Sequence, residues 1–340
     1  MFYNIDCIEG AQKYLQDGSV DLIITDPPYG IDGDKLHKHY NRNEKNVLDG
    51  YVDIPINEYE EFSFKWIKEA ERVLRPGGSI YIVSGYTNLI HILNALKATC
   101  LKEINHIIWK YNFGVYTKNK YISSHYHILY YVKPGGKPTF NTFARYGDSD
   151  KDENNRSLNY QDREDVWLIN REFKPNQIKN KNELPRELLI KMIQYSSNPG
   201  DLVCDFFLGS FSTAKVSIGL NRNATGFEIS KIAFEHQIKK MDKIQKGFLI
   251  PTLRKPSQTK FINSGKPLTE IEKENFKTEF LELISNGKTK KQSIEYLSEK
   301  YSRGYWSILK IIDGTTNKSS ISNSNKLNDF SNETLFNTFK

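Results

Sequence analysis

Short apolar runs alternate with stretches of helical spacing along residues 1–246. Runs at 20–25 and 79–84 are typical of buried parallel strands, and helical spacing over 58–74 stops at Arg75-Pro76-Gly77-Gly78. The alternation predicts an α/β fold with a doubly wound, mostly parallel sheet. Further strands are expected at 2–6, 104–110, 126–132, 201–205 and 223–228, and further helices at 11–17, 87–98, 184–195, 213–220 and 230–246.

The pattern is interrupted twice and changes near the end. Residues 30–57 form a polar stretch that predicts a long loop, and residues 133–182 lose the periodicity. Proline-marked residues then precede helical spacing at 269–285 and 289–312, which indicates two or three helices. We expect a main domain over 1–250 with an insertion at 133–182, a linker at 251–266, a small α-helical C-terminal module at 267–313 and a mobile Ser/Asn-rich tail at 314–340.

Amino-acid composition excludes few classes of protein. The net charge of +7 and the pI of about 8.9 suit a polyanionic partner without requiring one. Cys7, Cys100 and Cys204 are far apart and follow no ligand spacing, so neither disulfides nor a metal site are expected. Without a signal peptide or membrane span in the pattern, we expect a cytoplasmic protein.

The most distinctive tetrapeptide is Asp26-Pro27-Pro28-Tyr29, directly after the apolar run 20–25. Each proline fixes φ and lacks an N–H, so the turn is stiff and rich in hydrogen-bond acceptors. A carboxylate, a backbone carbonyl and an aromatic ring together suit a planar group that carries an amino group. An ordinary strand-ending turn is the alternative, and the rest of the chain has to decide between them.

Acidic residues follow several of the predicted strands, namely Asp6, Asp26, Asp205 and Glu228. Ligands of open α/β sheets bind at the carboxyl ends of the strands, so four acids at this edge predict a site. Each acid taken alone is equally well explained as a helix cap.

A second motif lies at residues 201–214, which read as a strand, a tight turn and the start of a helix. The turn lacks the GxGxxG fingerprint, so a pyrophosphate site is poorly supported. Glu228 follows about 20 residues after the turn, where a carboxylate typically holds ribose hydroxyls. A ribose contact without a pyrophosphate site indicates a nucleoside-type cofactor such as S-adenosylmethionine (SAM), with a plain α/β turn as the alternative.

Together these motifs resemble the β-class amino-methyltransferases of DNA, in which the catalytic motif precedes the cofactor motif. The resemblance rests on Asp26-Pro27-Pro28-Tyr29, on residues 198–210 with their Asp-Phe-Phe-Leu-Gly-Ser end, and on Gly226-Phe227-Glu228. Residues 4–9, 73–78, 108–112 and 124–129 match further motifs of that class, so the resemblance covers most of 1–246.

The resemblance implies a Rossmann-like, SAM-dependent enzyme that methylates an exocyclic amino group by direct in-line attack. Asp26 and the Pro27 carbonyl would accept the two amino hydrogens, and Tyr29 would stack on the target base. The catalytic residues would be Asp26, Pro27, Pro28 and Tyr29. The cofactor would contact Asp6, Cys7, Asp26, Asp205, Phe206, Gly209, Ser210, Phe211, Ser212, Glu228 and Ile229.

The sequence departs from the pattern of that class at two places. The class usually has DPFxGSGTT, whereas here Phe206 replaces the proline and Phe211 replaces the second glycine of the GSG. We expect the bulky Phe211 to reshape the methionine end of the pocket or to weaken cofactor binding. Upstream, residues 181–186 keep little besides Pro185 of a His/Lys-Pro signature.

The expected partner is duplex DNA with the target base flipped, because the target amino group takes part in base pairing. Adenine is preferred, since Asp rather than Ser opens the tetrapeptide. An N(4)-cytosine enzyme, a catalytically dead DNA-binding protein and an RNA or protein methyltransferase are the alternatives. Residues 133–182 are expected to recognise the target. The basic stretch 239–266 and the helix-turn-helix-like stretch 289–307 are further candidate DNA contacts. A homodimer and a cognate restriction endonuclease are left open.

Overall fold

The computed structural model describes residues 1–30, 53–114, 116–172, 183–256, 263 and 267–319. The chain divides into two compact units, Met1–Ser257 and Gln258–Lys340, and each is described by itself. Most of the polar stretch 30–57, the end of the insertion 133–182 and most of the tail lie outside the described residues. In the described part of the chain, no helix is long and apolar enough to cross a membrane.

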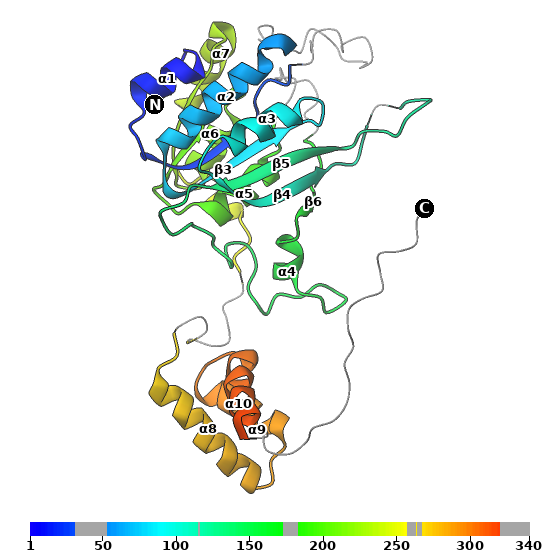
Figure 1. The fold of residues 1–340 in the computed structure, drawn as a ribbon, viewed down its shortest axis with the longest axis vertical. Helices are drawn as coiled ribbons and strands as arrows, with labels where there is room; N and C mark the ends of the chain where they lie inside the picture. Colours follow the sequence, from blue (N-terminus) through cyan, green and yellow to red (C-terminus); the bar gives the residue numbers. More distant parts are fainter. Residues whose placement is uncertain (31–52, 115, 173–182, 257–262, 264–266, 320–340) are drawn as a thin grey trace. The chain divides into compact units, whose positions relative to one another are not determined.

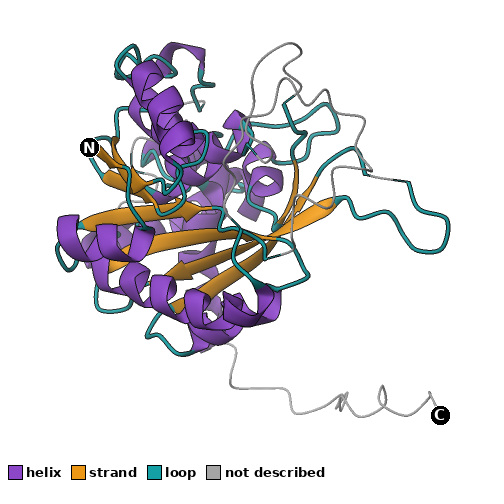
Figure 2. Cartoon of the chain, turned by 90° about the horizontal axis from the view of Figure 1, so that it is seen from above, coloured by secondary structure: helices purple, strands orange, loops and turns teal. Residues whose placement is uncertain are grey.

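A sheet of eight described strands lies at the centre of the first unit (Figures 1 and 2). Only β5 runs antiparallel to its neighbours, so the predicted mostly parallel sheet is confirmed. The strands lie in the order β1 (Phe2–Tyr3), β8 (Asn223–Phe227), β7 (Leu202–Asp205), β2 (Val20–Thr25), β3 (Leu74–Ser84), β5 (His125–Val132), β4 (Lys102–Lys110) and β6 (Val166–Leu168).

Helices cover both faces of this sheet (Figure 2). Successive residues of β2 show why: Ile23 packs in the core with the helices of one face, whereas Leu22 and Ile24 pack in the core of the other. This three-layer arrangement confirms the doubly wound class. One face carries α1 (Cys7–Tyr14), α2 (Ile56–Val73) and α3 (Leu89–Lys97), and the other carries α5 (Arg186–Ser196) and α6 (Ser212–Gly219), with α7 (Lys231–Met241) beside α6.

One helix and one strand begin earlier than the sequence predicts, for reasons that the structure shows. Helix α1 begins at Cys7 instead of residue 11, because the Asp6 side chain accepts hydrogen bonds from the N–H groups of Ile8 (2.8 Å) and Glu9 (3.2 Å). Strand β3 begins at Leu74 and includes the stretch that was expected only to end the helix. Gly77 makes this possible, since its φ is +77° and a Cβ there would lie 2.4 Å from the Lys137 carbonyl oxygen.

The insertion 133–182 contains structure that the sequence pattern did not predict. It forms α4 (Leu158–Asp162) and then β6, which pairs in parallel with β4 at the edge of the sheet. Asp162 ties α4 to α5, because it accepts from Arg145 Nε (2.9 Å) and the Tyr195 hydroxyl (2.6 Å). These partners are far apart in sequence, so periodicity within the insertion could not reveal them.

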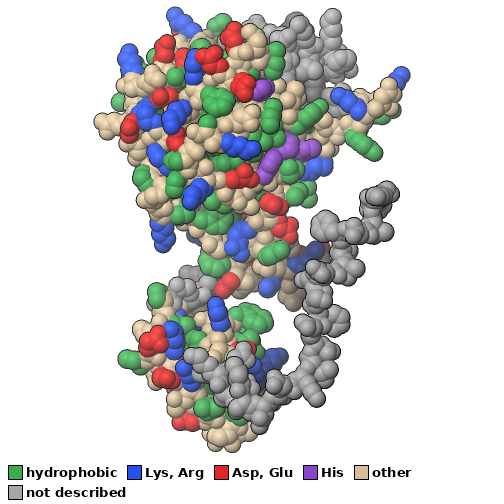
Figure 3. All heavy atoms as spheres, in the orientation of Figure 1, with side chains coloured by type: hydrophobic (Ala, Val, Ile, Leu, Met, Phe, Trp, Pro, Cys, Tyr) green, Lys and Arg blue, Asp and Glu red, His purple; other side chains and the backbone are tan. Residues whose placement is uncertain are grey.

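Histidines gather on the surface of the first unit where β4 and β5 pair (Figure 3). His106 Nε2 lies 2.8 Å from His127 Nδ1, and the ring centroids of His125 and His127 are 5.2 Å apart. Partial burial, together with the two neighbouring imidazoles, lowers the pKa of His127 to about 4. His127 is therefore neutral at physiological pH, and it can share a hydrogen bond with His106 across the two strands.

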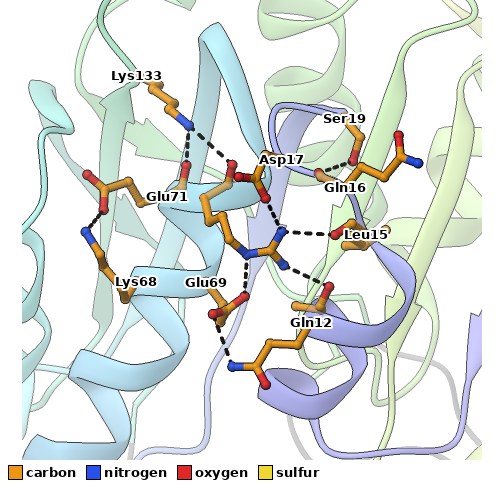
Figure 4. Close-up of polar contacts among 11 residues, drawn as sticks. Gln12, Leu15, Gln16, Asp17, Ser19, Lys68, Glu69, Glu71 and Lys133 are labelled. Atoms are coloured by element: carbon orange, nitrogen blue, oxygen red, sulfur yellow. Dashed lines mark hydrogen bonds and ion pairs between the residues drawn. The ribbon is translucent and has the colours of Figure 1, made fainter.

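Arg72 of α2 holds the segment that leads from α1 into β2. Figure 4 labels three of its partners, Leu15, Asp17 and Glu69. Its guanidinium donates to the carbonyls of Ala11 (2.9 Å) and Leu15 (3.0 Å). It also bonds the carboxylates of Asp17 (2.5 Å) and Glu69 (2.8 Å). The Arg72 side chain thus fixes the start of β2, and the tetrapeptide 26–29 follows the end of the same strand.

The second unit is a bundle of three described helices, α8 (Glu270–Ser285), α9 (Lys290–Lys300) and α10 (Tyr305–Ser319). Helix α10 extends to Ser319, so the prediction of a tail from residue 314 is wrong at its start. The buried core of the bundle takes two residues from each helix, Phe276, Phe280, Ile294, Leu297, Ile308 and Ile312.

Candidate active site

Three acids meet at the carboxyl ends of neighbouring strands, as the sequence predicted. β7 lies between β2 and β8, so Asp205 at its end lies between Asp26 and Glu228. Thr25, the last residue of β2, donates from its hydroxyl to Asp205 Oδ1 (3.0 Å). Asp6 differs from the other three, because β1 ends at Tyr3 and Asp6 caps a helix.

The tetrapeptide is held rigid by residues that sequence analysis did not single out. The Tyr59 hydroxyl donates to the Pro28 carbonyl (2.8 Å), and Asn88 Nδ2 donates to the Tyr29 carbonyl (2.6 Å). No described residue donates to the Pro27 carbonyl. The turn therefore presents one backbone acceptor beside the Asp26 carboxylate, while the following carbonyls are occupied.

The Asp26 carboxyl has an unusual acidity. Burial raises its pKa to about 7, and Asp205 adds to the rise. A hydrogen bond from the Tyr29 hydroxyl (2.5 Å) and the positive charge of Arg171 act in the opposite direction. Near neutral pH both the protonated and ionised forms of Asp26 are therefore populated, which suits a group that accepts a proton or a hydrogen bond during a reaction.

An aromatic cluster from β4 and β5 surrounds Arg171 next to this acid. The Tyr126 ring stacks on Tyr29 with a centroid distance of 5.8 Å and on Trp109 at 5.5 Å. The Arg171 guanidinium carbon lies 4.9 Å from the Tyr111 ring centroid and 5.1 Å from that of Tyr126. The sequence pattern does not single out Arg171, because its aromatic partners are distant in sequence.

Glu228 is oriented by two backbone N–H groups at the neighbouring turn. Gly209 N donates to Glu228 Oε2 (2.8 Å) and Ser230 N donates to Oε1 (2.8 Å). The two strands approach closely here, since a Cβ on Gly226 would lie 2.2 Å from the Asp205 carbonyl oxygen. Burial raises the pKa of Glu228, whereas the two N–H groups favour its ionised form. The carboxylate is thus preorganised as an acceptor.

Asp205 and the serines of the turn extend the polar site. Asp205 Oδ1 accepts from the Phe207 N–H (3.0 Å), and burial raises the Asp205 pKa to about 6. The hydroxyls of Ser210 and Ser212 lie 2.6 Å apart, and Ser212 donates to Glu183 Oε1 (2.9 Å). Glu183 is a further site residue that sequence analysis missed, because the segment around it matches the expected signature poorly.

Phe211 does not project from the turn as expected. Its ring is fully buried, with ring centroids 5.2 Å from Phe2 and 5.8 Å from Phe234. The backbone has φ +60°, the left-handed conformation that the glycine of the family pattern would adopt without cost. Phenylalanine in place of this glycine therefore adds a side chain to the core, and the strain lies in the left-handed backbone of Phe211.

The remaining residues named from the sequence divide into buried and exposed ones. Phe206 and Cys7 have side chains in the core, and burial raises the pKa of the Cys7 thiol. Ile229 is exposed at the end of β8. Among the residues that the structure describes, no group of three or more His, Cys, Asp or Glu is placed to hold a metal ion.

Comparison with known proteins agrees with this arrangement. The model of the DNA methylase family, N6_N4_Mtase, matches residues 20–240, which include the tetrapeptide and the turn after β7. The chain belongs to this family.

Similar proteins of this family include methyltransferases of known name. The chain is 33% identical over 245 residues to the type II methyltransferase M.HpaI of Haemophilus parainfluenzae, across 70% of this chain and 73% of that protein. It is 35% identical over 264 residues to M.BamHI of Bacillus amyloliquefaciens, across 72% of this chain and 58% of that protein. It is 29% identical over 245 residues to the DNA adenine methyltransferase YhdJ of Escherichia coli (strain K12), across 68% of this chain and 79% of that protein.

Solved structures share the fold of the methylase at lower sequence identity. The SAM complex of TTHA0409 from Thermus thermophilus, a putative DNA modification methylase, has a TM-score of 0.53 at 20% identity over 73% of this chain and 95% of that one. The cytosine-N4-specific PvuII DNA methyltransferase has a TM-score of 0.52 at 16% identity over 75% and 93%. These likenesses concern the fold alone.

Proposed function

We propose that this methylase transfers a methyl group from SAM to the exocyclic amino group of adenine in DNA. The observation that carries the proposal is the turn itself, in which Tyr59 and Asn88 hold the Pro28 and Tyr29 carbonyls. The Asp26 carboxylate and the carbonyl of the next residue, Pro27, are left as two acceptors, which match the two hydrogens of one amino group.

The residues of the turn would act by placing these acceptors. An exocyclic amine is a weak nucleophile, because its lone pair is delocalised into the ring. Hydrogen bonds to Asp26 and the Pro27 carbonyl favour a pyramidal nitrogen with a localised lone pair, and this stabilises the transition state. SAM, when bound, supplies a methyl group on a sulfonium that is already a strong electrophile. Formation of the new N–C bond would break the sulfonium–methyl bond and release the neutral thioether, and Asp26 would accept the amino proton along its hydrogen bond.

The turn after β7 and the neighbouring Glu228 provide donors and acceptors that fit a nucleoside cofactor. Glu228 is a fixed carboxylate of the kind that holds ribose hydroxyls, and Asp6 and Asp205 add acceptors nearby in the fold. The proposed contacts are those named from the sequence. Because the side chains of Cys7, Phe206 and Phe211 are buried, these three would contribute backbone atoms only.

Adenine is proposed as the target because Asp opens the tetrapeptide and because the relative YhdJ is named an adenine methyltransferase. An N(4)-cytosine enzyme is the second candidate, since both bases carry an amino group beside a ring nitrogen and PvuII methyltransferase shares the fold. A catalytically dead protein is favoured in the sequence mainly by the bulk of Phe211, and this argument weakens because the ring is buried in the core.

The insertion supplies a basic pocket that we propose contacts the DNA. This pocket of about 310 Å³ lies between the insertion, α5 and residues 252–254. Arg186 and Arg254 would meet phosphates there, whereas Arg145 is paired with Asp162; the Arg254 guanidinium lies 4.7 Å from the Tyr146 ring centroid. The lining includes Arg145, Tyr146, Glu172, Arg186, Glu187 and Arg254.

The relatives suggest the biological setting. M.HpaI and M.BamHI are named type II methyltransferases, so we propose a restriction-modification role with a cognate endonuclease in the cytoplasm. The same proposal includes residues 133–182 as the target-recognition region and residues 1–250 as the catalytic domain.

One experiment tests the reaction and the target base together. The protein is incubated with SAM labelled in the methyl group and with duplex DNA, and the DNA is then digested and analysed for methylated nucleosides. Labelled N(6)-methyladenine is expected. Labelled N(4)-methylcytosine would select the second candidate, and absence of label in DNA would overturn the proposed function.

A further inference from the structure

The second unit has a feature that the proposed reaction does not use. Helices α9 and α10 are joined by a turn of four residues, 301–304, that contains Gly304. Both helices pack on α8 through a common core. Two helices joined by a three- or four-residue turn and supported by a third are the arrangement of a helix-turn-helix.

A buried arginine fixes this turn against α8. Arg303 is 4% exposed, and its Nη2 donates to both carboxylate oxygens of Glu272 (2.9 and 3.0 Å). Its Nη1 donates to the Asn263 carbonyl (3.0 Å). Ser302 adopts φ +49°, which lets the chain reverse within the turn. The start of α10 therefore has a defined position relative to α9.

The first turns of α10 present an exposed aromatic residue and a lysine. Ile308 and Ile312 point into the core, whereas Trp306 and Lys310, each two positions before one of them, lie on the opposite side of the helix. Trp306 is 77% exposed, and Lys310 is exposed one turn later on the same side. Such exposure is unusual for tryptophan and indicates a binding surface.

Charge in the second unit is divided between the helices. Residues 288–314 contain five exposed lysines and three acidic residues besides the buried Arg303, whereas α8 contains five acidic and two basic residues. Lys290 and Lys291 stand in the first turn of α9, and both are exposed. The α9–α10 side thus suits a polyanion, and the α8 side does not.

We propose that α9 and α10 form a DNA-reading element, in which α10 lies in the major groove. Trp306 and Lys310 would face the base edges, and Lys290 and Lys291 would meet backbone phosphates. This inference rests on the proposed function for the choice of DNA as the ligand. It adds a second contact with the duplex, separate from the catalytic unit.

Trp306 provides a direct assay, because the other three tryptophans of the chain, Trp66, Trp109 and Trp167, are at most 7% exposed. Acrylamide quenching of the full-length protein should report mainly Trp306. Addition of an unlabelled duplex should reduce that quenching about 3-fold or more, as expected for a side chain that becomes buried at an interface. Trp306→Phe should lose the quenchable component.

Charge variants of the full-length protein test the same surface through binding. Lys291→Gln combined with Lys310→Gln should weaken binding to a fluorescent duplex roughly 10-fold at about 0.1 M salt, and should lower the salt slope by about 1 to 2. The matched control removes two lysines of α8, Lys273→Gln with Lys277→Gln, and should leave affinity and slope unchanged.

The outcomes separate this inference from the proposed reaction. Equal quenching of Trp306 with and without DNA, together with an unchanged salt slope in the Lys291/Lys310 variant, would overturn the DNA-reading element. A change of mass in sedimentation for Trp306→Ala, with unchanged DNA affinity, would assign the surface to a second copy of the chain and also overturn it. Binding is measured in the Asp26→Ala background as well, so failure of methyl transfer leaves this test intact.

Discussion

At the scale of single residues, the site depends on how burial changes the chemistry of Asp26. An aspartate in water is fully ionised at neutral pH, yet burial brings this carboxyl close to half protonation. Tyr29 limits the rise of the Asp26 pKa through its hydrogen bond, and Arg171 limits it through its positive charge. The surroundings of Asp26 therefore set its pKa, and the ionised carboxylate lowers the free energy of unfolding of the protein.

Asp26→Ala should abolish methyl transfer, with a loss of at least about 10³-fold in kcat, because one of the two fixed acceptors is gone. Cofactor binding should survive within a few-fold, since Glu228 and its turn are untouched. Single-turnover transfer of labelled methyl and equilibrium dialysis of SAM measure the two effects. Activity equal to that of the parent protein would refute the catalytic assignment of Asp26.

The pH dependence follows from the raised pKa of about 7 for Asp26. The ionised form is the acceptor, so kcat should fall as pH falls through about 7. Arg171→Met should move this midpoint to higher pH, because the positive charge that favours ionisation is removed. The pH–rate profile measures both, and an unchanged midpoint in the variant would contradict the role given to Arg171.

The same shift predicts an effect on stability. The folded protein binds more protons at Asp26 than the unfolded chain between about pH 4 and 7, so this group makes stability decrease as pH rises through that window. Asp26→Asn should therefore raise the urea midpoint at pH 8 but not at pH 4. A urea midpoint that is lower in the variant at pH 8 would count against the buried, destabilised carboxylate.

At position 211 the glycine variant should be more stable than the alanine variant, which is the reverse of the usual order inside a helix. Phe211→Ala should destabilise the protein by about 3 to 5 kcal/mol through loss of the buried ring. Phe211→Gly should be more stable than Phe211→Ala by about 0.5 to 1 kcal/mol, because glycine adopts φ +60° freely. At Val216 inside α6, glycine should be worse than alanine by about 1 kcal/mol. Urea denaturation measures all four variants, and the same order at both positions would contradict the account.

At the scale of elements, the site depends on strands whose two ends are fixed by different partners. The far end of β2 is held by Thr25 on Asp205, while its entry is held by Arg72 of α2. The guanidinium satisfies two carbonyls of the α1–β2 connection, which water would otherwise have to solvate. Such links between elements decide whether the acids at the sheet edge keep their spacing.

Arg72→Met should therefore destabilise the first unit by about 2 to 4 kcal/mol, since two partly buried carbonyls and the partly buried Glu69 carboxylate lose their donor. The matched control is Lys65→Met on the same helix. Lys65 pairs with Glu61 in an exposed ion pair, with side chains 58% and 72% exposed, so the change should stay within about 0.5 kcal/mol. Urea denaturation compares them, and equal effects would show that Arg72 is not a structural link.

At the scale of the whole molecule, the chain combines a catalytic unit with a separate helical unit. Each has its own buried core, and the family match ends at residue 240 inside the first unit. The proposed catalytic residues thus all lie within Met1–Ser257.

Truncation after Ser257 should leave a folded enzyme. Its thermal midpoint should stay within about 3 °C of the corresponding transition of the full chain, because no strand or core residue of the first unit is removed. The kcat at saturating DNA should remain within about 2-fold, while KM for DNA rises. Calorimetry and steady-state kinetics measure these quantities, and an unfolded truncation product would show that the units depend on each other.

Much of the first unit follows from local rules and was predictable. Buried strands such as β2 are continuous apolar runs, and amphipathic helices such as α2 have regular spacing, so both are visible in the sequence. The edge strand β6 and helix α4 were missed, because three- and five-residue elements carry too little periodicity. Helix α1 was misplaced because its start depends on the side chain of Asp6, not on apolar spacing.

The sequence by itself determined the fold class, the order of the two motifs and the acids Asp26, Asp205 and Glu228, because strand ends and stiff prolines are local features. Only the tertiary structure decided that Tyr59 and Asn88 occupy the following carbonyls, that Arg171 reaches Asp26, and that the ring of Phe211 lies in the core. The physical reason is that these contacts join residues distant in the chain, and their energies depend on burial, which no local pattern encodes.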